Sequence, residues 1–447
     1  MDTKDIVATY IKQNKLLDHE RIHLLALSGG ADSVALLLIM KDLGYDIEAV
    51  HCNFNLRGEE SNRDENFVKF LCERQGVKLH LAHFDTKEYA STHRISIEMA
   101  ARDLRYAYFE QLRLDIDAAD ICVAHHRDDN VETVIMNLIR GTGINGLTGI
   151  RPKNENIIRP LLCLCRNDIE TYLKEKNQDY ITDSSNLVDD VIRNKIRLNI
   201  LPLLKDINPA VTKNIQKTSE YVREATKLLD NKLLQIKHCI TTKKNDIVYV
   251  CISKLLKEIS PSYVLYETIK EYGFSSSQSE MIFERLKSQP GSIFHSNDYD
   301  LLIDRDNIII EKKYTAINPI VIIEDGTYII SKSKKLKIQR EIIDATFNIP
   351  HTANEVCLDA DEISFPLTVR HYKQGERFVP YGMKGSKLIS DYLTDRKKTL
   401  FQKKQQLVLA DAQDRIIWLI NERPNNSFCV KENTCRVLHI TLQKNEL

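Results

Sequence analysis

The chain has 447 residues, which is enough for about three domains of ordinary size. Its 63 basic and 63 acidic side chains cancel, so the net charge indicates no particular partner. A content of 43% hydrophobic and 28% charged residues is typical of a globular protein. The acidic start has no apolar signal segment, and the apolar run at 34–40 is too short to cross a bilayer. We therefore expect no secreted, membrane, collagenous or disordered protein.

The ten cysteines are scattered along the chain. No two of them form a CxxC pair, and none lies at zinc-finger spacing from a histidine. Unpaired cysteines in so large a chain are typical of reduced thiols in a cytosolic protein. We therefore expect a cytoplasmic protein without redox or zinc chemistry.

Short apolar strands alternate with helices over the first two hundred residues. The predicted strands are 23–27, 47–52, 78–84 and 121–124, and the predicted helices are 31–41, 60–75, 95–114 and 128–139. This alternation predicts an α/β fold with a doubly wound, mainly parallel sheet. Ligands of such sheets bind beyond the carboxyl ends of the strands, where the loops carry the chemistry.

A glycine-rich motif follows the first predicted strand and opens the next helix. Its members are Ser28, Gly29, Gly30, Ala31, Asp32 and Ser33. Two glycines let the backbone approach an anion, and a helix N-terminus offers free N–H groups. The motif lacks the lysine of a Walker A loop, and Asp32 would repel a bare phosphate, so Asp32 makes sense if it holds Mg²⁺ against a triphosphate. The alternative is a plain glycine turn with Asp32 as a helix cap.

Two arginines lie three residues apart on the long predicted helix 95–114. Arg102 and Arg105 share one face of this helix and have the spacing of a phosphate clamp. An exposed helix with surface salt bridges explains the same pattern equally well.

The sequence AHHRDDNVET at 124–133 places histidines and acids at the end of a predicted strand. Asp129 and Glu132 have the spacing of a helix N-cap and its partner in the first turn, so capping explains part of the motif. Capping does not require His125 and His126. Histidine and carboxylate side chains at this place can bind Mg²⁺, act as a base or hold an ammonium group, and we favour a functional interpretation.

The segment 141–146 matches the dinucleotide fingerprint GxGxxG. It follows a predicted helix rather than a strand, and no helix is evident after it, so the required context is missing. We predict a flexible loop on the active-site side of the domain.

The pattern changes after residue 204. A polar helix is predicted at 214–237, strand-like and helical pieces alternate to about 313, and 320–338 is rich in strands. Residues 365–404 hold ten basic and three acidic side chains beside several aromatic residues. This composition suits a phosphate backbone with stacked bases, although a solvated surface accounts for it equally well.

These motifs together resemble the tRNA(Ile)-lysidine synthetase family of PP-loop ATP-pyrophosphatases. The stretches that carry the resemblance are LALSGGADS, HCNFNLRGEESNRDENFV, EMAARDLRY, AHHRDDNVETVIMNLIRGTGINGLTGI, RPLL, ITDSSN and RNKIR. The C-terminal stretches RHYKQGERFVPYG and SKLISDYLTDRK match more weakly. The resemblance implies a PP-loop ATP-binding catalytic domain (adenine nucleotide alpha hydrolase-like) at 1–205, a mainly helical tRNA-binding domain at 214–315 and a small α+β tRNA-binding domain at 350–447.

The resemblance also implies roles for individual residues. Residues 28–33 would hold the ATP phosphates, with Asp32 and Asp129 as acids linked to Mg²⁺ and to catalysis. His125 and Arg105 would lie at the adenylation site. Asp129 and Glu132 would bind the lysine ammonium, and Arg193 or Arg197 would stabilise the activated intermediate. For tRNA binding we predict Lys397, Lys398, Lys403 and Lys404.

This chain departs from the family pattern at two positions, Phe54 and Asn55, where the family usually has His and Gly. The neighbouring Arg57, Arg63 and Asp64 are present.

The implied activity joins free L-lysine to C2 of the wobble cytidine in the CAU-anticodon isoleucine tRNA. ATP is cleaved to AMP and pyrophosphate through an adenylated cytidine, and codon reading changes from AUG to AUA. The nearest alternative is a PP-loop tRNA 2-thiolation enzyme, which needs a catalytic cysteine or an iron–sulfur site. An amidotransferase-like ligase and a non-catalytic tRNA-binding protein are further alternatives. We expect no membrane partner and leave open a homodimer.

Overall fold

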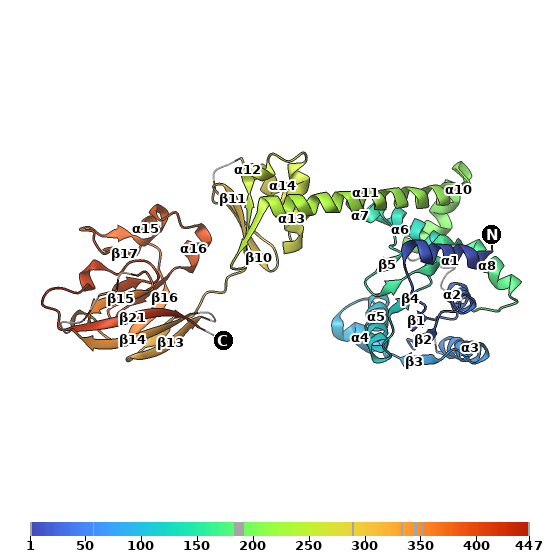
Figure 1. Cartoon of the computed structure of the whole chain (residues 1–447), viewed down its shortest axis with the longest axis horizontal. Coiled ribbons are helices and arrows are strands. Elements are labelled where there is room, and N and C mark those ends of the chain that lie inside the picture. The colour runs from blue at the N-terminus through green and yellow to red at the C-terminus, as the bar shows by residue number, and fades with distance from the viewer. Residues whose placement is uncertain are drawn as a thin grey trace. The chain divides into compact units, whose positions relative to one another are not determined.

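The computed structural model describes residues 2–56, 58–182, 192–287, 290–331, 334–343, 347, 349–350 and 352–445. Arg57 and part of the ITDSSN stretch, residues 183–186, lie outside this description. The chain forms two compact units, Met1–Asp230 and Asn231–Leu447, which are described separately (Figure 1). No described helix is long and apolar enough to cross a membrane.

The first unit is built on a six-stranded sheet with the order β3-β2-β1-β4-β6-β5. Its strands are β1 (His23–Ala26), β2 (Ile47–Asn53), β3 (Leu79–His83), β4 (Asp120–Cys122), β5 (Lys153–Asn154) and β6 (Ile157–Ile158). All neighbouring pairs are parallel except β5 with β6. The predicted doubly wound, mainly parallel sheet is confirmed.

Helices cover both faces of this sheet because successive strand residues point to opposite sides. Leu25 packs into one core and its neighbour Leu24 into the other. The first core is covered by α1 (Thr3–Asn14), α2 (Ala31–Asp42), α3 (Glu59–Gln75) and α8 (Arg166–Glu175). The second core lies under α5 (Ile97–Asp115), which contributes Phe109 and Leu112. The four helices predicted for this region are confirmed, with α5 beginning two residues later than expected.

Apart from α4 (Thr86–His93), which lies between β3 and α5, the remaining helices of this unit follow β4, and the last of them continues past residue 230 into the second unit. They are α6 (Arg127–Arg140), α7 (Gly143–Leu147), α9 (Ile192–Lys195), the π-helix η3 (Ile196–Ile200), α10 (Leu201–Ile207) and α11 (Val211–Ile240). The loop predicted at 141–146 is wrong, because α7 forms there. Gly141 ends α6 in the left-handed conformation with φ of 70°. The Gly146 N–H then donates to the carbonyl of Thr142, the N-cap residue of α7. The GxGxxG match still lacks its strand, since a helix precedes it.

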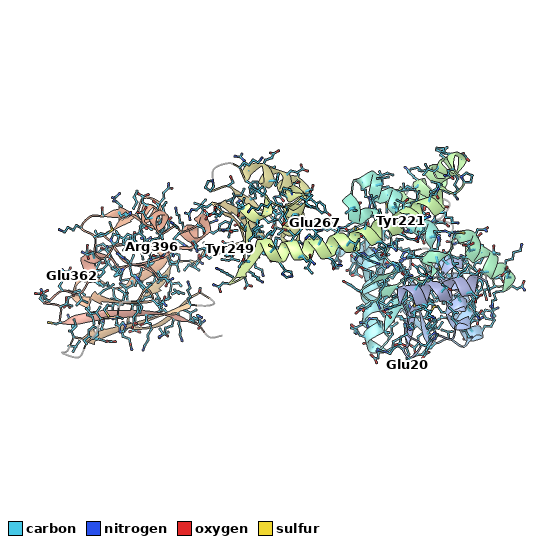
Figure 2. All side chains as sticks on the ribbon, turned by 45° about the horizontal axis from the view of Figure 1, so that its top comes forward. Glu20, Tyr221, Tyr249, Glu267, Glu362 and Arg396 are labelled. Carbon is cyan, nitrogen blue, oxygen red and sulfur yellow. The ribbon has the colours of Figure 1, made fainter. Side chains whose placement is uncertain are left out.

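The second unit begins with a five-stranded antiparallel sheet of order β7-β8-β11-β10-β9. Its strands are β7 (Thr241–Lys244), β8 (Ile247–Cys251), β9 (Ile293–His295), β10 (Tyr299–Asp304) and β11 (Asn307–Lys312). The accompanying helices are α12 (Ile252–Leu255), α13 (Pro261–Ile269) and α14 (Ser276–Arg285). Tyr249 on β8 and Glu267 on α13 mark this segment in Figure 2. The predicted helices are present, and the strand-like pieces between them form this sheet.

The C-terminal part is an α+β structure with two four-stranded antiparallel sheets. One contains β12 (Ile320–Ile322), β16 (Leu367–His371), β19 (Leu407–Ala410) and β20 (Ile416–Leu419); the other contains β13 (Gly326–Ser331), β14 (Lys334–Ile342), β21 (Arg436–Lys444) and β15 (Glu355–Asp359). Both sheets contribute to one core that includes the fully buried Trp418. The predicted basic segment 365–404 spans β16, the short strands β17 (Arg377–Phe378) and β18 (Lys387–Leu388), and the helices α15 (Ile389–Asp395) and α16 (Leu400–Gln405). Of its ten basic residues, Lys403 and Lys404 lie on α16 and none lies on α15.

Candidate active site

The glycine-rich loop joins the end of β1 to the start of α2. Gly29 has φ of 90°, and a Cβ at this position would lie 2.7 Å from Ile181 Cδ1, so only glycine fits. The Ser33 hydroxyl donates to the Gly30 carbonyl (3.0 Å) and accepts the Ser28 N–H (3.2 Å), which fixes the turn. The N-cap residue of α2 is Gly30, and among the described residues no side chain caps the start of this helix. Its first N–H groups are therefore free to bind an anion.

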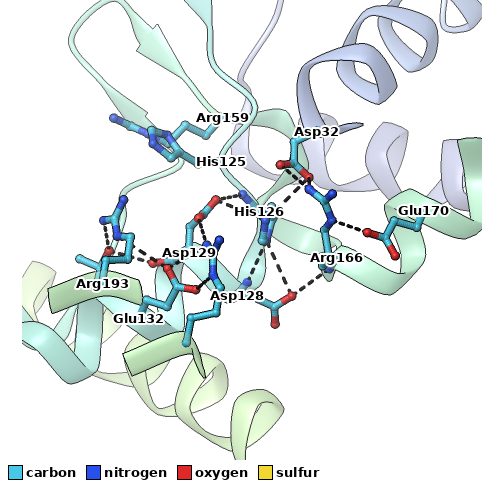
Figure 3. Close-up of polar contacts among 12 residues, drawn as sticks. Asp32, His125, His126, Asp128, Asp129, Glu132, Arg159, Arg166, Glu170 and Arg193 are labelled. Atoms are coloured by element: carbon cyan, nitrogen blue, oxygen red, sulfur yellow. Dashed lines mark hydrogen bonds and ion pairs between the residues drawn. The ribbon is translucent and has the colours of Figure 1, made fainter. Parts of the chain in front are cut away.

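Asp32 lies in the first turn of α2 and is held by an arginine that the sequence analysis did not select. The Arg166 Nη1 contacts both Asp32 carboxylate oxygens, at 2.9 and 2.8 Å, and Arg166 Nε contacts Glu170 at 2.7 Å (Figure 3). Burial raises the pKa of Asp32, while the neighbouring His126 and Arg166 oppose this rise. Arg166 thus orients the Asp32 carboxylate beside the glycine-rich loop.

The start of α6 is capped by His126, not by Asp129 as the spacing suggested. His126 Nδ1 accepts the Asp128 N–H (3.2 Å), and the Asp129 carboxylate accepts the His126 N–H (3.0 Å). This arrangement points Asp129 back toward the strand end. Although burial alone would raise it, the pKa of Asp129 is held below its usual value by His126. Asp129 therefore offers a carboxylate charge at the edge of the sheet.

Glu132 is only 1% exposed and lies one turn further along α6. Arg197 binds it through two contacts, Nε to Oε1 at 2.6 Å and Nη2 to Oε2 at 3.1 Å. Arg197 Nη2 also lies 3.4 Å from Asp129, and Arg193 Nε lies 3.6 Å from Glu132. Burial raises the pKa of Glu132 against the effect of Arg197. The two carboxylates and two arginines thus form one charged cluster (Figure 3).

A magnesium site would use the two carboxylates that flank His126. His126 Nε2 lies 3.8 Å from an Asp32 oxygen and 3.6 Å from an Asp129 oxygen. Within the described part of the chain, no three His, Cys, Asp or Glu side chains gather into a metal cage. Mg²⁺ commonly binds through one or two carboxylates, with phosphate oxygens and water completing its shell. The donor set of Asp32 and Asp129 fits a metal ion that arrives with a nucleotide.

Arg102 and Arg105 of α5 are held by aromatic rings. The Arg105 guanidinium carbon lies 5.1 Å from the centre of the Phe54 ring, and Arg102 lies 4.9 Å from the Tyr106 ring. Phe54 in turn stacks on Phe84 at 5.7 Å. Stacking leaves the in-plane N–H groups of a guanidinium available to a ligand, which an ion pair would not. The unusual Phe54 therefore supports Arg105.

These groups line one pocket of about 1290 Å³ at the carboxyl ends of the strands. Of the predicted site residues, its lining includes Ser28, Gly30, Asp32, Ser33, Arg105, His125, Asp129 and Arg193. Glu132 does not line the pocket. It lies 3.6 Å from Arg193, which does line the pocket. The structure thus brings the candidate nucleotide loop and the candidate catalytic groups together. They meet beyond the carboxyl ends of the strands, where ligands of parallel sheets bind.

The four candidate tRNA-binding lysines have different surroundings in the second unit. Lys398 Nζ lies 2.5 Å from the buried Glu422, which also pairs with Arg396. Lys403 donates to the Thr394 hydroxyl at 2.8 Å. Lys397 and Lys404 are exposed. Lys398 is thus committed to an internal ion pair, whereas the side chains of Lys397 and Lys404 are exposed.

The fold and the glycine-rich loop define a nucleotide-binding domain of the PP-loop class. A family model described as PP-loop domain matches residues 3–204, and one described as TilS substrate binding domain matches residues 243–313. The chain is 45% identical to the tRNA(Ile)-lysidine synthase of Bacteroides thetaiotaomicron, over 97% of this chain and 98% of the relative. It is 43% identical to that of Parabacteroides distasonis, with the same coverage. The chain therefore belongs to the tRNA(Ile)-lysidine synthase family, as its motifs predicted.

Proposed function

We propose that the chain is an AMP-forming ligase that attaches free L-lysine to C2 of the wobble cytidine in the CAU-anticodon isoleucine tRNA. The product, lysidine, would change codon reading from AUG to AUA. The observation that carries this proposal is the shared pocket of the phosphate loop, His125, Asp129 and the arginines. A reaction that activates a base with ATP and then adds an amine needs these groups in one place.

In the first step, the 2-carbonyl oxygen of cytidine attacks the α-phosphate of ATP and pyrophosphate leaves. The free N–H groups at the start of α2 offer donors to the phosphate oxygens. Arg105 also lines the pocket and adds a positive charge there. Asp32 and Asp129 would hold Mg²⁺, which supplies further charge stabilisation to the phosphates when bound.

In the second step, the ε-amine of lysine attacks C2, and AMP leaves with the former carbonyl oxygen. The amine is nucleophilic only after losing a proton, so a carboxylate must accept it. Asp129 lines the pocket and Glu132 lies in the same cluster. We assign the ammonium of lysine to this pair. Arg193 also lines the pocket and would stabilise the activated intermediate.

The thiolation alternative is less favoured because of the state of three cysteines: Cys52, which lines the pocket, and the pair Cys163 and Cys165. Burial raises the pKa of Cys52 to about 12. Burial raises the pKa of Cys163 to about 12 and also raises the pKa of Cys165. A thiol is a weak nucleophile when its pKa is high, since the thiolate is the reactive form. All ten cysteines are free, which agrees with a cytoplasmic location.

The decisive experiment is the incorporation of labelled lysine into an isoleucine tRNA transcript with anticodon CAU. We expect one lysine per AMP and per pyrophosphate, and no label when the wobble cytidine is replaced. ATP cleavage without lysine label would contradict the proposal, and a sulfur donor would then be tried as the second substrate.

Lys404 and Lys398 should differ in their effect on tRNA binding. We expect Lys404→Ala to weaken binding and to reduce the salt slope by about one, because one phosphate contact is lost. Lys398→Ala should instead lower the melting temperature, since it leaves Glu422 with one cation fewer. Binding titrations at several salt concentrations test the first expectation. An unchanged slope after also replacing Lys397 and Lys403 would move the tRNA surface elsewhere.

Phe54→Leu should slow adenylation about fivefold, whereas Phe54→Tyr should retain the wild-type rate. A stacked cation is worth roughly 1 kcal/mol, and leucine keeps the apolar contact but removes the aromatic face. Rates of pyrophosphate release measure this difference. Equal rates for the leucine and tyrosine variants would show that the ring does not support Arg105.

A further inference from the structure

Arg159 contacts His125, and neither step of the proposed reaction uses it. It follows β6 and precedes the 3₁₀-helix η1 (Pro160–Cys163). Arg159 Nε donates to His125 Nδ1 at 3.2 Å, and its Nη1 donates to the Arg151 carbonyl at 2.9 Å. Figure 3 shows the two side chains against one another, away from the carboxylate cluster. The second contact fixes the guanidinium, so that its Nε–H points at the imidazole.

The direction of this hydrogen bond determines where the imidazole proton resides. A guanidinium has donors only, so His125 Nδ1 must be the acceptor. The remaining ring proton is then on Nε2, and His125 lines the active-site pocket. Nε2 has no hydrogen-bond partner among the described residues. It is free to donate to a ligand.

We infer that Arg159 is a positioning residue that holds His125 in the neutral Nε2–H form. His125 would then donate a hydrogen bond to the nucleotide phosphate during adenylation and could not act as a general base through Nδ1. This inference rests on the proposed function for its catalytic consequence, but the ring form is a property of the chain alone. Fixing a tautomer through the second ring nitrogen is a known means of orienting histidine.

The charged groups around His125 agree with a neutral ring. They come from three elements: His126 and Asp129 at the start of α6, Arg193 on α9, and Arg159 itself. Burial lowers the pKa of His125 to about 4; Asp129 opposes this, and Arg159, Arg193 and His126 reinforce it. His125 is therefore uncharged at neutral pH, and Nε2 is the only hydrogen-bond donor of its ring.

The ring form is tested directly by NMR of the full-length protein labelled with ¹⁵N-histidine. His125→Asn identifies the His125 signals, and wild type should show a protonated Nε2 with an acceptor Nδ1. In Arg159→Met, which lacks the donor, these signals should move toward a mixture of tautomers. Arg159→Lys retains a donor and should partly restore the wild-type pattern. Arg151→Met is the matched control, because only the backbone of Arg151 contacts Arg159.

Adenylation kinetics provide the second readout. Arg159→Met should lower kcat for pyrophosphate release at least tenfold with little change in the KM for ATP, and Arg151→Met should not. A wild-type ring that is charged or protonated on Nδ1 overturns the inference, as does an Arg159→Met variant with unchanged signals and kcat. If wild type incorporates no lysine, the proposed function fails, yet the NMR result still decides the ring form.

Discussion

Asp32→Asn is expected to reduce adenylation by at least about a hundredfold while leaving tRNA affinity within a few fold. Asparagine keeps the size of the side chain but removes the charge that faces the phosphate loop, and losing one electrostatic group at a reacting centre costs about this much. The carboxylate has two short contacts to Arg166 and lies 3.8 Å from His126. None of these involves the second unit, so tRNA contacts there should persist. Pyrophosphate release and tRNA binding measure the two effects separately.

Asp42→Asn is the matched control for this variant. Asp42 lies at the opposite end of the same helix, where it pairs with Lys176 at 2.7 Å and is 36% exposed. Its replacement should change neither adenylation nor tRNA binding. Melting temperatures of both variants distinguish a lost catalytic charge from a disturbed helix. Near-normal turnover of Asp32→Asn would refute the assigned role of Asp32.

The sheet and the phosphate loop could be predicted because their signals are local. Leu24 and Leu25 belong to a short apolar run followed by Ser28, two glycines and an acid at the start of a helix. This order predicts a strand, a turn and a helix. The charged cap of α6 was only partly predictable. The spacing of Asp129 and Glu132 fits a capping pair, but α6 begins one turn earlier, where His126 is the N-cap and Asp129 its partner in the first turn.

The arginine contacts could not be predicted because they join residues that are distant in the sequence. Arg166 and Asp32 are 134 positions apart, and Arg197 and Glu132 are 65 apart. No local periodicity distinguishes Arg166 from a solvent-exposed arginine at the start of a helix. The RNKIR stretch did indicate functional arginines, but only packing shows that Arg197 is bound to Glu132 whereas Arg193 lines the pocket.

Glu132→Gln is expected to separate the two chemical steps. Glutamine has the same shape, so the fold of α6 and the pocket should persist, and adenylation should stay within about tenfold of wild type. Glutamine can neither accept the proton of an ammonium nor offset its charge. Lysine transfer should therefore fall at least about a hundredfold, the usual size of a general-base contribution. Adenylated tRNA should accumulate, which quenched-flow measurements of pyrophosphate and lysine incorporation would reveal.

Glu170→Gln controls for the loss of an ion pair alone. Glu170 also binds an arginine at 2.7 Å, but its side chain is 45% exposed, so both steps should remain near wild type. The contact between Arg197 and Glu132 makes a specific alternative testable. If Glu132 served only to hold Arg197, Glu132→Gln would slow adenylation and lysine transfer together, since Arg197 also reaches Asp129. A loss of rate confined to lysine transfer would instead require that Glu132 act on lysine. The buried Glu132 carboxylate would then be the group that removes the proton from the amine and makes it a nucleophile.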